Sequence, residues 1–217
     1  WSISVNEINK GFSQNFFDGL QKATGDFIFL CDQDDIWYSD KVQSMTDIMI
    51  ASPQINILSG GYKPLVSKSM DSLSKIYYFF DSILSKKNKK VVLQKFKRSS
   101  VYTTRPGWTY CVRKGFLDSY KSLYHNYSSH DGFFWRYGMI TDSFYNFNYE
   151  TGQFRRTSNS TSSFSNIKKD KVSREIELSK NYKQICLDML EYLSETEVPN
   201  QKYKQKIYMK TIGYLDA

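Results

Sequence analysis

The hydrophobic pattern in the first third of the chain changes repeatedly between the spacing of a helix and that of a buried strand. Apolar residues recur at helical spacing in 11–24 and 40–50, and each of these segments precedes a short, continuous apolar run, at 27–31 and 55–58. Such runs are typical of strands that are buried on both faces in a parallel sheet. The alternation of helices and strands therefore predicts an α/β fold.

The rest of the chain continues this pattern after an insertion at 62–104, which is basic towards its end. We expect an aromatic helix at 73–84 inside the insertion, strands at 108–112 and 143–149, helices at 114–123 and 133–137, a Ser/Thr/Asn-rich loop at 155–165, and two amphipathic helices from residue 173 that are separated at 198–200. These segments divide the chain into an α/β region, 1–165, and a C-terminal helical extension, 166–217.

The composition is that of a globular protein. With 217 residues, of which 24% are charged, the chain can bury one sizeable core. No apolar segment approaches the roughly 20 residues that span a bilayer, and the polar start of the chain is not a secretory signal. Three isolated cysteines, Cys31, Cys111 and Cys186, fit neither a zinc site nor a disulfide framework. We therefore expect a protein of the reducing cytoplasm.

The formal net charge is +8, and the excess of Lys and Arg is concentrated in 86–98 and 168–174. Such stretches either bind an anionic partner or form solvated surface. We do not expect a nucleic-acid module, because the sequence has no helix-turn-helix, zinc-finger or RNP pattern. Anionic lipid and phosphorylated substrates are the anionic partners that remain.

Three carboxylates, Asp32, Asp34 and Asp35, directly follow the apolar run 27–31. In an open α/β sheet, ligands bind beyond the carboxyl ends of the strands, so these acids mark a candidate site. The N-terminus of the next helix, where Asp caps free N–H groups, would explain Asp35 or Asp40 but not Asp32. A divalent cation that grips the phosphates of a nucleotide would neutralise all three carboxylates.

Two other kinds of acidic site share part of this pattern. An aspartyl phosphatase would use Asp32 as its nucleophile and Asp34 as its general acid. Against it, Ile36 stands where that signature has Thr or Val, and no acidic pair follows on a second strand. A calcium loop is excluded, because Trp37 and Gln43 occupy the places of its Gly and its closing Glu.

Five short segments surround these acids, in the order Asn9-Lys10-Gly11, Asn15-Phe16, Ala23-Thr24-Gly25-Asp26-Phe27-Ile28, Asp32-Gln33-Asp34-Asp35-Ile36-Trp37 and Asp40-Lys41. In this order and spacing they resemble family 2 glycosyltransferases, and more narrowly the rhamnosyltransferase-like branch of bacterial polysaccharide synthesis. Three later segments agree with the resemblance: Gly107-Trp108-Thr109-Tyr110-Cys111-Val112-Arg113, His130-Asp131-Gly132-Phe133-Phe134-Trp135 and Phe154-Arg155-Arg156-Thr157-Ser158-Asn159. The resemblance spans residues 9–160.

The resemblance implies a GT-A-like (Rossmann-like) mixed sheet flanked by helices. It also implies an inverting transfer of a sugar, such as rhamnose, from a UDP- or dTDP-linked donor to a hydroxyl of a growing cell-surface polysaccharide or lipid-linked glycan. Asp131 would be the general base, and Asp34 with Asp32 would hold Mn²⁺ or Mg²⁺. The nucleotide sugar would be contacted by Asn9, Gly11, Asn15, Asp32, Trp37 and Arg155, and the acceptor side would include Trp108 and His130.

Several of these residues also have structural interpretations. Asp131 precedes a helix and could be its N-cap, and Trp108 could belong to the core. Lys41 is expected to pair with one of the acids at the strand end, and His130 to orient its loop. An HD-type phosphohydrolase is not expected, because only His125 remains to complete its metal site.

The chain departs from the family pattern in two places. Thr157 stands where the family has His, and the two opening strands that end in Pro-Thr-Tyr-Asn and Asp-Asp-Gly-Ser are missing. We therefore expect a fragment of a longer enzyme, since Trp1 is not a natural start. A non-catalytic carbohydrate-binding or partner domain of the same fold is the alternative. The basic insertion and the C-terminal helices suggest peripheral contact with the anionic inner face of the membrane, where lipid-linked acceptors sit.

Overall fold

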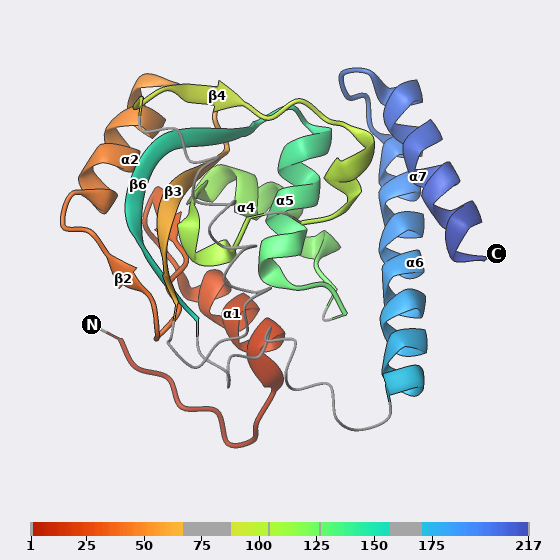
Figure 1. Cartoon of the computed structure of the whole chain (residues 1–217), viewed down its shortest axis with the longest axis horizontal. Coiled ribbons are helices and arrows are strands. Elements are labelled where there is room, and N and C mark those ends of the chain that lie inside the picture. Colours follow the sequence, from red (N-terminus) through yellow and green to blue (C-terminus); the bar gives the residue numbers. More distant parts are fainter. Residues whose placement is uncertain (1, 67–87, 104, 126, 157–170, 217) are drawn as a thin grey trace.

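The fold was determined as a computed structural model, which describes residues 2–66, 88–103, 105–125, 127–156 and 171–216. A strongly curved mixed sheet forms its centre, with helices against both faces and two long C-terminal helices along one side (Figure 1). The expected helix at 73–84 and most of the expected loop at 155–165 lie outside the described residues.

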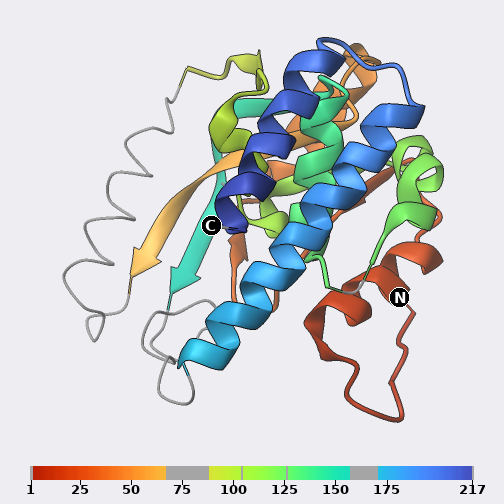
Figure 2. The same cartoon turned by 90° about the vertical axis from the view of Figure 1, so that its right-hand side faces the viewer.

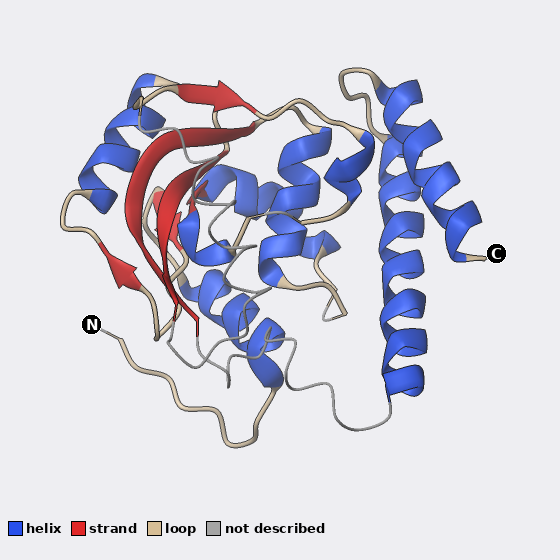
Figure 3. Ribbon diagram, in the orientation of Figure 1, coloured by secondary structure: helices blue, strands red, loops and turns tan. Residues whose placement is uncertain are grey.

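The elements follow one another as helices, strands and short 3₁₀ turns (Figure 3). The helices are α1 (Gly11–Lys22), α2 (Lys41–Ala51), α4 (Lys114–Tyr120), α5 (His130–Ile140), α6 (Lys171–Glu195) and α7 (Gln201–Leu215). The strands are β1 (Phe27–Phe29), β2 (Ile36–Trp37), β3 (Ile57–Val66), β4 (Val91–Leu93), β5 (Tyr110–Arg113) and β6 (Phe144–Arg156). The 3₁₀ turns are η1 (Arg98–Val101), η2 (Gly107–Thr109) and η3 (Lys121–Leu123).

The strands are ordered β1-β5-β3-β6-β2, and β4 pairs with β6. Only the β3–β6 pair is parallel, and the other pairs within the described residues are antiparallel. The expectation that 27–31 lies in a parallel sheet was therefore wrong, because β1 runs antiparallel to β5. An apolar run indicates that both faces of a strand are covered, but it does not indicate the direction of the neighbouring strand.

The two longest strands extend beyond the segments that predicted them. β3 continues past the Gly60–Gly61 pair, which we expected to end it, and β6 continues to Arg156. The register between the two strands shifts at these glycines. A Cβ added at Gly61 would lie 2.9 Å from the carbonyl oxygen of Tyr149, so the glycine permits a close approach of β6 rather than a turn.

The sheet separates two apolar clusters. On one face, α2 packs Met45 and Met49 against Leu58 and Cys111. On the other face, α1, α4 and α5 form the larger cluster, which includes the fully buried Phe134. The sheet is thus covered on both sides, as an α/β architecture requires.

The C-terminal helices share the larger cluster. α6 and α7 lie side by side (Figure 2), and Met189 and Tyr208 pack into the same core as α5. Lys204 of α7 is buried and donates hydrogen bonds to the Ile140 carbonyl and to Asp142, each at 2.8 Å. The predicted break between the two helices is confirmed, with Asn200 in the left-handed conformation. Within the described residues, no helix is long and apolar enough to cross a membrane.

Candidate functional site

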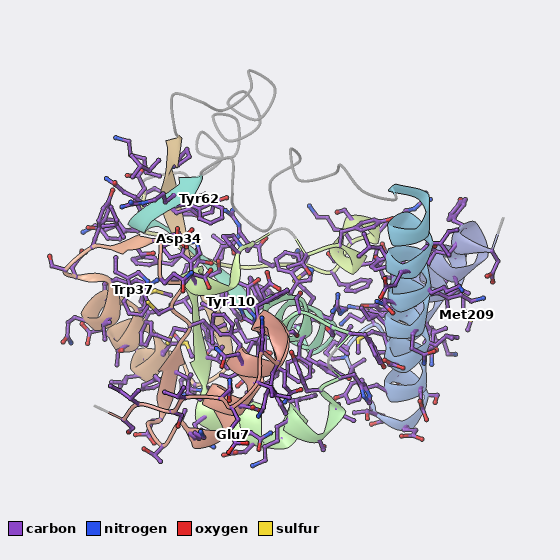
Figure 4. The ribbon with its side chains drawn as sticks, turned by 90° about the horizontal axis from the view of Figure 1, so that it is seen from below. Glu7, Asp34, Trp37, Tyr62, Tyr110 and Met209 are labelled. Atoms are coloured by element: carbon purple, nitrogen blue, oxygen red, sulfur yellow. The ribbon has the colours of Figure 1, made fainter. Side chains whose placement is uncertain are left out.

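The acidic residues form the loop between β1 and β2. The Asp34 side chain is exposed, whereas Asp32 and Asp35 are half-buried. β2 pairs with β6 directly after this loop, and the backbone N–H of Arg155 donates to Asp35 Oδ1 at 2.9 Å. The structure therefore brings the acidic loop and Arg155, which are far apart in the sequence, to the same end of the sheet. Figure 4 shows Asp34 there with Trp37 and Tyr62.

Lys41, at the start of α2, is fully buried beneath this loop. Its Nζ donates to the Trp108 carbonyl at 2.6 Å and lies 4.0 Å from the centre of the Trp37 ring. Burial lowers the pKa of Lys41 to about 7, although the charges of Asp35 and Asp32 act in the opposite direction. The acids are thus close enough to influence Lys41, as expected, but its hydrogen bond goes to a backbone carbonyl of a different segment.

The Trp108 side chain is completely buried. Its ring packs with Tyr62 and Phe154, and a Cβ added at Gly152 would lie 2.9 Å from the Trp108 ring. This arrangement favours the interpretation of Trp108 as a core residue over contact with an acceptor. Trp37 lies half-buried at the edge of the same group, and its indole N–H is buried without a hydrogen-bond partner among the described residues.

Asp131 lies in the first turn of α5. The N-cap of this helix is Ser129, whose Oγ accepts a hydrogen bond from the Gly132 N–H at 3.2 Å. Asp131 Oδ1 accepts from the same N–H at 2.8 Å, and its side chain is half-buried. Ser129 is therefore the N-cap residue, and Asp131 adds a second acceptor for the same N–H, which agrees with its structural interpretation as a residue of the helix start.

His130 is buried beside Asp131, with 5% of its surface exposed. Its ring stacks on Phe16 of α1 at 3.8 Å between centroids, and a Cβ added at Gly107 would lie 2.7 Å from its Nε2. Burial lowers the pKa of His130, against the influence of Asp131. This packing suits the expected role of orienting the loop, but the buried ring is not presented to an acceptor.

The residues predicted around the start of α1 make hydrogen bonds within that segment, one of them to Asn6, which was not predicted. Asn9 Oδ1 accepts from the Gly11 N–H at 2.9 Å, and Asn15 Oδ1 accepts from the Asn6 side chain at 2.9 Å. Gly11 has a positive φ of 75°, which a glycine adopts without strain. All three residues are exposed. These hydrogen bonds order the entry to α1, and α1 in turn contacts α5 through Phe16.

One polar recess was not anticipated from the sequence. It is lined by Ser59, Gly60, Gly61, Arg105, Asn146, Phe147 and Asn148. Arg105 Nη1 and Asn146 Oδ1 are buried there without hydrogen-bond partners within the described part of the chain. An unpaired donor and an unpaired acceptor therefore line one small space. In the sequence, this recess could have been suspected from the charged residue Arg105, which directly precedes the Pro106-Gly107-Trp108 segment.

Comparison with known proteins identifies the family. The family model described as "Glycosyl transferase family 2" matches residues 2–113. The chain belongs to family 2 of the glycosyltransferases. This family membership removes the phosphatase interpretation. The matched residues include α1, the acidic loop and Trp108, whereas Asp131 and Arg155 lie beyond them.

Two further comparisons gave matches, one in sequence and one in fold. A "dTDP-rhamnosyl transferase RfbG" of Shigella flexneri is 30% identical over 138 residues, which cover 58% of this chain and 47% of the relative. The crystal structure of S. aureus TarS residues 1–349 matches with a TM-score of 0.57 at 10% identity, over 92% of this chain and 49% of that chain. The TarS likeness confirms the GT-A-like fold with a helical C-terminal part. The chain spans about half the length of each relative.

The glycosyltransferase site was also tested for its capacity to hold a metal ion. No group of three His, Cys, Asp or Glu side chains that could hold one occurs in the described ranges. Asp34, which is exposed, and the half-buried Asp32 offer the hard oxygen donors that Mg²⁺ and Mn²⁺ accept. These residues fit part of a coordination sphere, and the other ligands would come from the substrate phosphates or from water.

Proposed function

We propose that this glycosyltransferase transfers a sugar, with inversion, from a nucleoside-diphosphate sugar to a hydroxyl group of a glycan. The observation that carries the proposal is the pairing of β2 with β6, which sets the acidic loop beside Arg155. Carboxylates and a guanidinium at one end of a sheet suit a diphosphate, which needs cations and charge-assisted hydrogen bonds.

For the donor, dTDP-rhamnose is the first candidate to test, because RfbG carries that specificity in its name. UDP-sugars are the second. Asn9, Gly11 and Asn15 remain predicted contacts of the nucleotide sugar, and Trp37 offers a half-buried ring with a free indole N–H at the edge of the loop. Aromatic faces suit the apolar faces of sugars and bases.

A Mn²⁺ or Mg²⁺ ion held by Asp34 with Asp32 would neutralise charge on the departing diphosphate when bound. The chain's own contribution would be the Arg155 side chain, which is exposed beside the loop and can donate two parallel hydrogen bonds to phosphate oxygens. The Asp35 carboxylate fixes the backbone of Arg155, so the loop and the guanidinium keep their relative position.

Asp131 is the proposed general base. The acceptor oxygen would attack the anomeric carbon as the bond from that carbon to the diphosphate oxygen breaks, and the hydroxyl proton would pass to the Asp131 carboxylate. Its place in the first turn of α5, half-buried and held by the Gly132 N–H, keeps the carboxylate in a fixed orientation. The buried recess of Arg105 and Asn146 is the proposed contact for an acceptor hydroxyl, which can both donate and accept.

We also propose that the protein works in the cytoplasm, at the anionic surface of the membrane, where a lipid-linked acceptor is available. α7 supports this proposal, because its outward residues combine Lys with large aromatic and apolar groups and the helix contains no Asp or Glu. The exposed residues of this outward face are Lys202, Tyr203, Lys206, Met209, Lys210 and Tyr214. Figure 4 shows Met209 on the side of α7 that points away from the sheet. Such a face suits an interface of anionic lipid.

The proposed function is tested by titrating the chain with dTDP-rhamnose and with UDP-sugars, with and without Mn²⁺, and by measuring release of the nucleoside diphosphate in the presence of a glycan acceptor. Binding and turnover are expected with one donor. Asp131→Asn should retain donor binding and lose at least about 100-fold in turnover. Glycan binding without donor binding would instead indicate a carbohydrate-binding domain, and unchanged turnover in Asp131→Asn would overturn the base assignment.

A further inference from the structure

Lys41 connects the two sides of the candidate site. Its ammonium group lies between two indole rings, 4.0 Å from the centre of Trp37 and 4.6 Å from that of Trp108. The side chain has no exposed surface. A buried cation is costly unless hydrogen bonds and nearby charge compensate for the lost water, so its place in this position calls for an explanation.

The first connection leads to the acidic loop. Trp37 belongs to β2, which follows the loop, and pairs with Gly152 of β6. The Lys41 N–H donates to the Tyr38 carbonyl at 3.1 Å, and the Tyr38 N–H donates to the Thr151 carbonyl at 3.0 Å. The end of the acidic loop is thereby fixed to both Lys41 and β6.

The second connection leads to Asp131. The acceptor of the Lys41 ammonium is the carbonyl of Trp108, at 2.6 Å. Trp108 follows Gly107, and a Cβ at Gly107 would lie 3.0 Å from Cβ of Asp131 and 2.7 Å from His130 Nε2. The turn that receives the Lys41 hydrogen bond therefore packs directly against the proposed base.

We propose that Lys41 is a positioning residue, whose ammonium group holds the acidic loop and the turn at Gly107 and Trp108 in a fixed relation, so that the donor-binding acids and Asp131 act on the same sugar. The effect on turnover rests on the proposed function. The connection that Lys41 makes between the acidic loop and the turn does not depend on it. The contacts with two indole rings and the hydrogen bond to a backbone carbonyl need an amino group at the end of a side chain of this length, and an apolar side chain would only fill the space.

Lys204 provides a matched control. It is also buried, with 1% of its side chain exposed, and it donates to a backbone carbonyl and to Asp142. It lies in α7 and contacts neither the acidic loop nor the turn at Gly107. Lys41→Met and Lys204→Met each remove one buried ammonium group. A comparison of the two variants therefore separates the effect of misplaced site residues on turnover from the effect of lower stability.

The first measurement is turnover with saturating donor, taken well below the melting temperature of each variant. Lys41→Met is expected to lose about 10- to 100-fold in kcat with donor affinity largely retained, because a small misplacement of reacting groups has an effect of this size. Lys204→Met is expected to keep the wild-type kcat. Equal losses in both variants, or no loss in Lys41→Met, would overturn the proposal.

The second measurement does not depend on activity. Amide hydrogen exchange should increase in Lys41→Met within 31–40 and 105–110 together, and the rest of the chain should stay protected as in the wild type. Lys204→Met should leave both segments unchanged. If the wild type shows no transferase activity but this local pattern holds, the proposed function fails and the connection stands; uniform or absent change in exchange overturns the connection itself. Should Lys41→Met fail to fold, Trp37→Phe, which weakens one ring contact, should give the same pattern to a smaller extent.

Discussion

At the scale of single residues, His130 shows how burial alters a side chain that the sequence marks as functional. Its imidazole lies between Phe16 and Gly107, and burial lowers its pKa below the ordinary value of 6.5. The unfolded chain therefore takes up a proton at a higher pH than the folded chain does. The contribution of the neutral His130 to the free energy of unfolding is therefore fully present above about pH 6.5. It is lost as the pH falls from there through the pKa of His130 in the folded state.

This dependence can be measured by denaturant unfolding between pH 7 and pH 5. The wild type should lose stability on acidification, by at most about 1.4 kcal/mol per pH unit from this one proton. His130→Gln should flatten the dependence, and His125→Gln, which changes an exposed residue, should leave it as in the wild type. A dependence that is the same in all three proteins would show that His130 is not its source.

Arg105 gives a prediction about the acceptor. Removing its guanidinium leaves Asn146 Oδ1 as the polar atom of the recess that has no hydrogen-bond partner among the described residues. Arg105→Met should raise the KM for a glycan acceptor by about tenfold or more, the usual effect of losing a charged hydrogen bond, and should leave the affinity for the donor unchanged. An equal change in the KM for the acceptor and in the affinity for the donor would contradict a contact of Arg105 with the acceptor alone.

At the scale of elements, the contact between the 3₁₀ turn η2 and the start of α5 depends on a glycine. A Cβ at Gly107 would lie within 3.0 Å of both His130 and Asp131, so either the turn or the helix must move to accept it. Gly107→Ala should cost about 1–3 kcal/mol in unfolding free energy and should also lower turnover. Gly115→Ala, in the open first turn of α4, is the control and should be neutral or stabilising. Equal stability of the two variants would contradict the close packing at Gly107.

The outward face of α7 gives a second prediction at this scale. Binding of the chain to vesicles that contain phosphatidylglycerol should exceed binding to neutral vesicles and should weaken with added salt. Replacing Lys202, Lys206 and Lys210 by Glu should abolish it. The same replacement of Lys22, Lys63 and Lys121, which are also exposed, matches the change in net charge and should have a smaller effect. Equal effects would mean that net charge, rather than α7, determines the binding.

At the scale of the whole molecule, the sequence predicted the α/β class, most helices and the helical C-terminal part, because hydrophobic spacing reports local periodicity and burial. It did not predict strand direction, since β1 and a parallel strand have the same apolar pattern. The lengths of β3 and β6 were also underestimated, because Gly60 and Gly61 have the composition of a turn but serve close packing.

The candidate site was predicted in its residue types more than in its contacts. Asp34, Asp131 and Arg155 were predicted from the resemblance to family 2 glycosyltransferases, and the structure joins the acidic loop to Arg155 through the β2–β6 pair. The hydrogen bond of Lys41 to the Trp108 carbonyl could not be predicted, because it joins segments whose approach depends on the complete fold. For the same reason His130 could not be recognised as buried, whereas burial of Trp108 was one of the two interpretations that the sequence allowed.

The parallel pairing of β3 with β6 also has a consequence for how the chain reaches its native state. Between these partners lie β5, α4 and α5, so the central pair cannot form until a long intervening segment has been brought back over the sheet. Loop closure of this kind costs entropy before any contact repays it, which slows folding relative to proteins with mainly local contacts. We therefore expect the acidic loop, which depends on β6 for its partner, to become ordered late in folding.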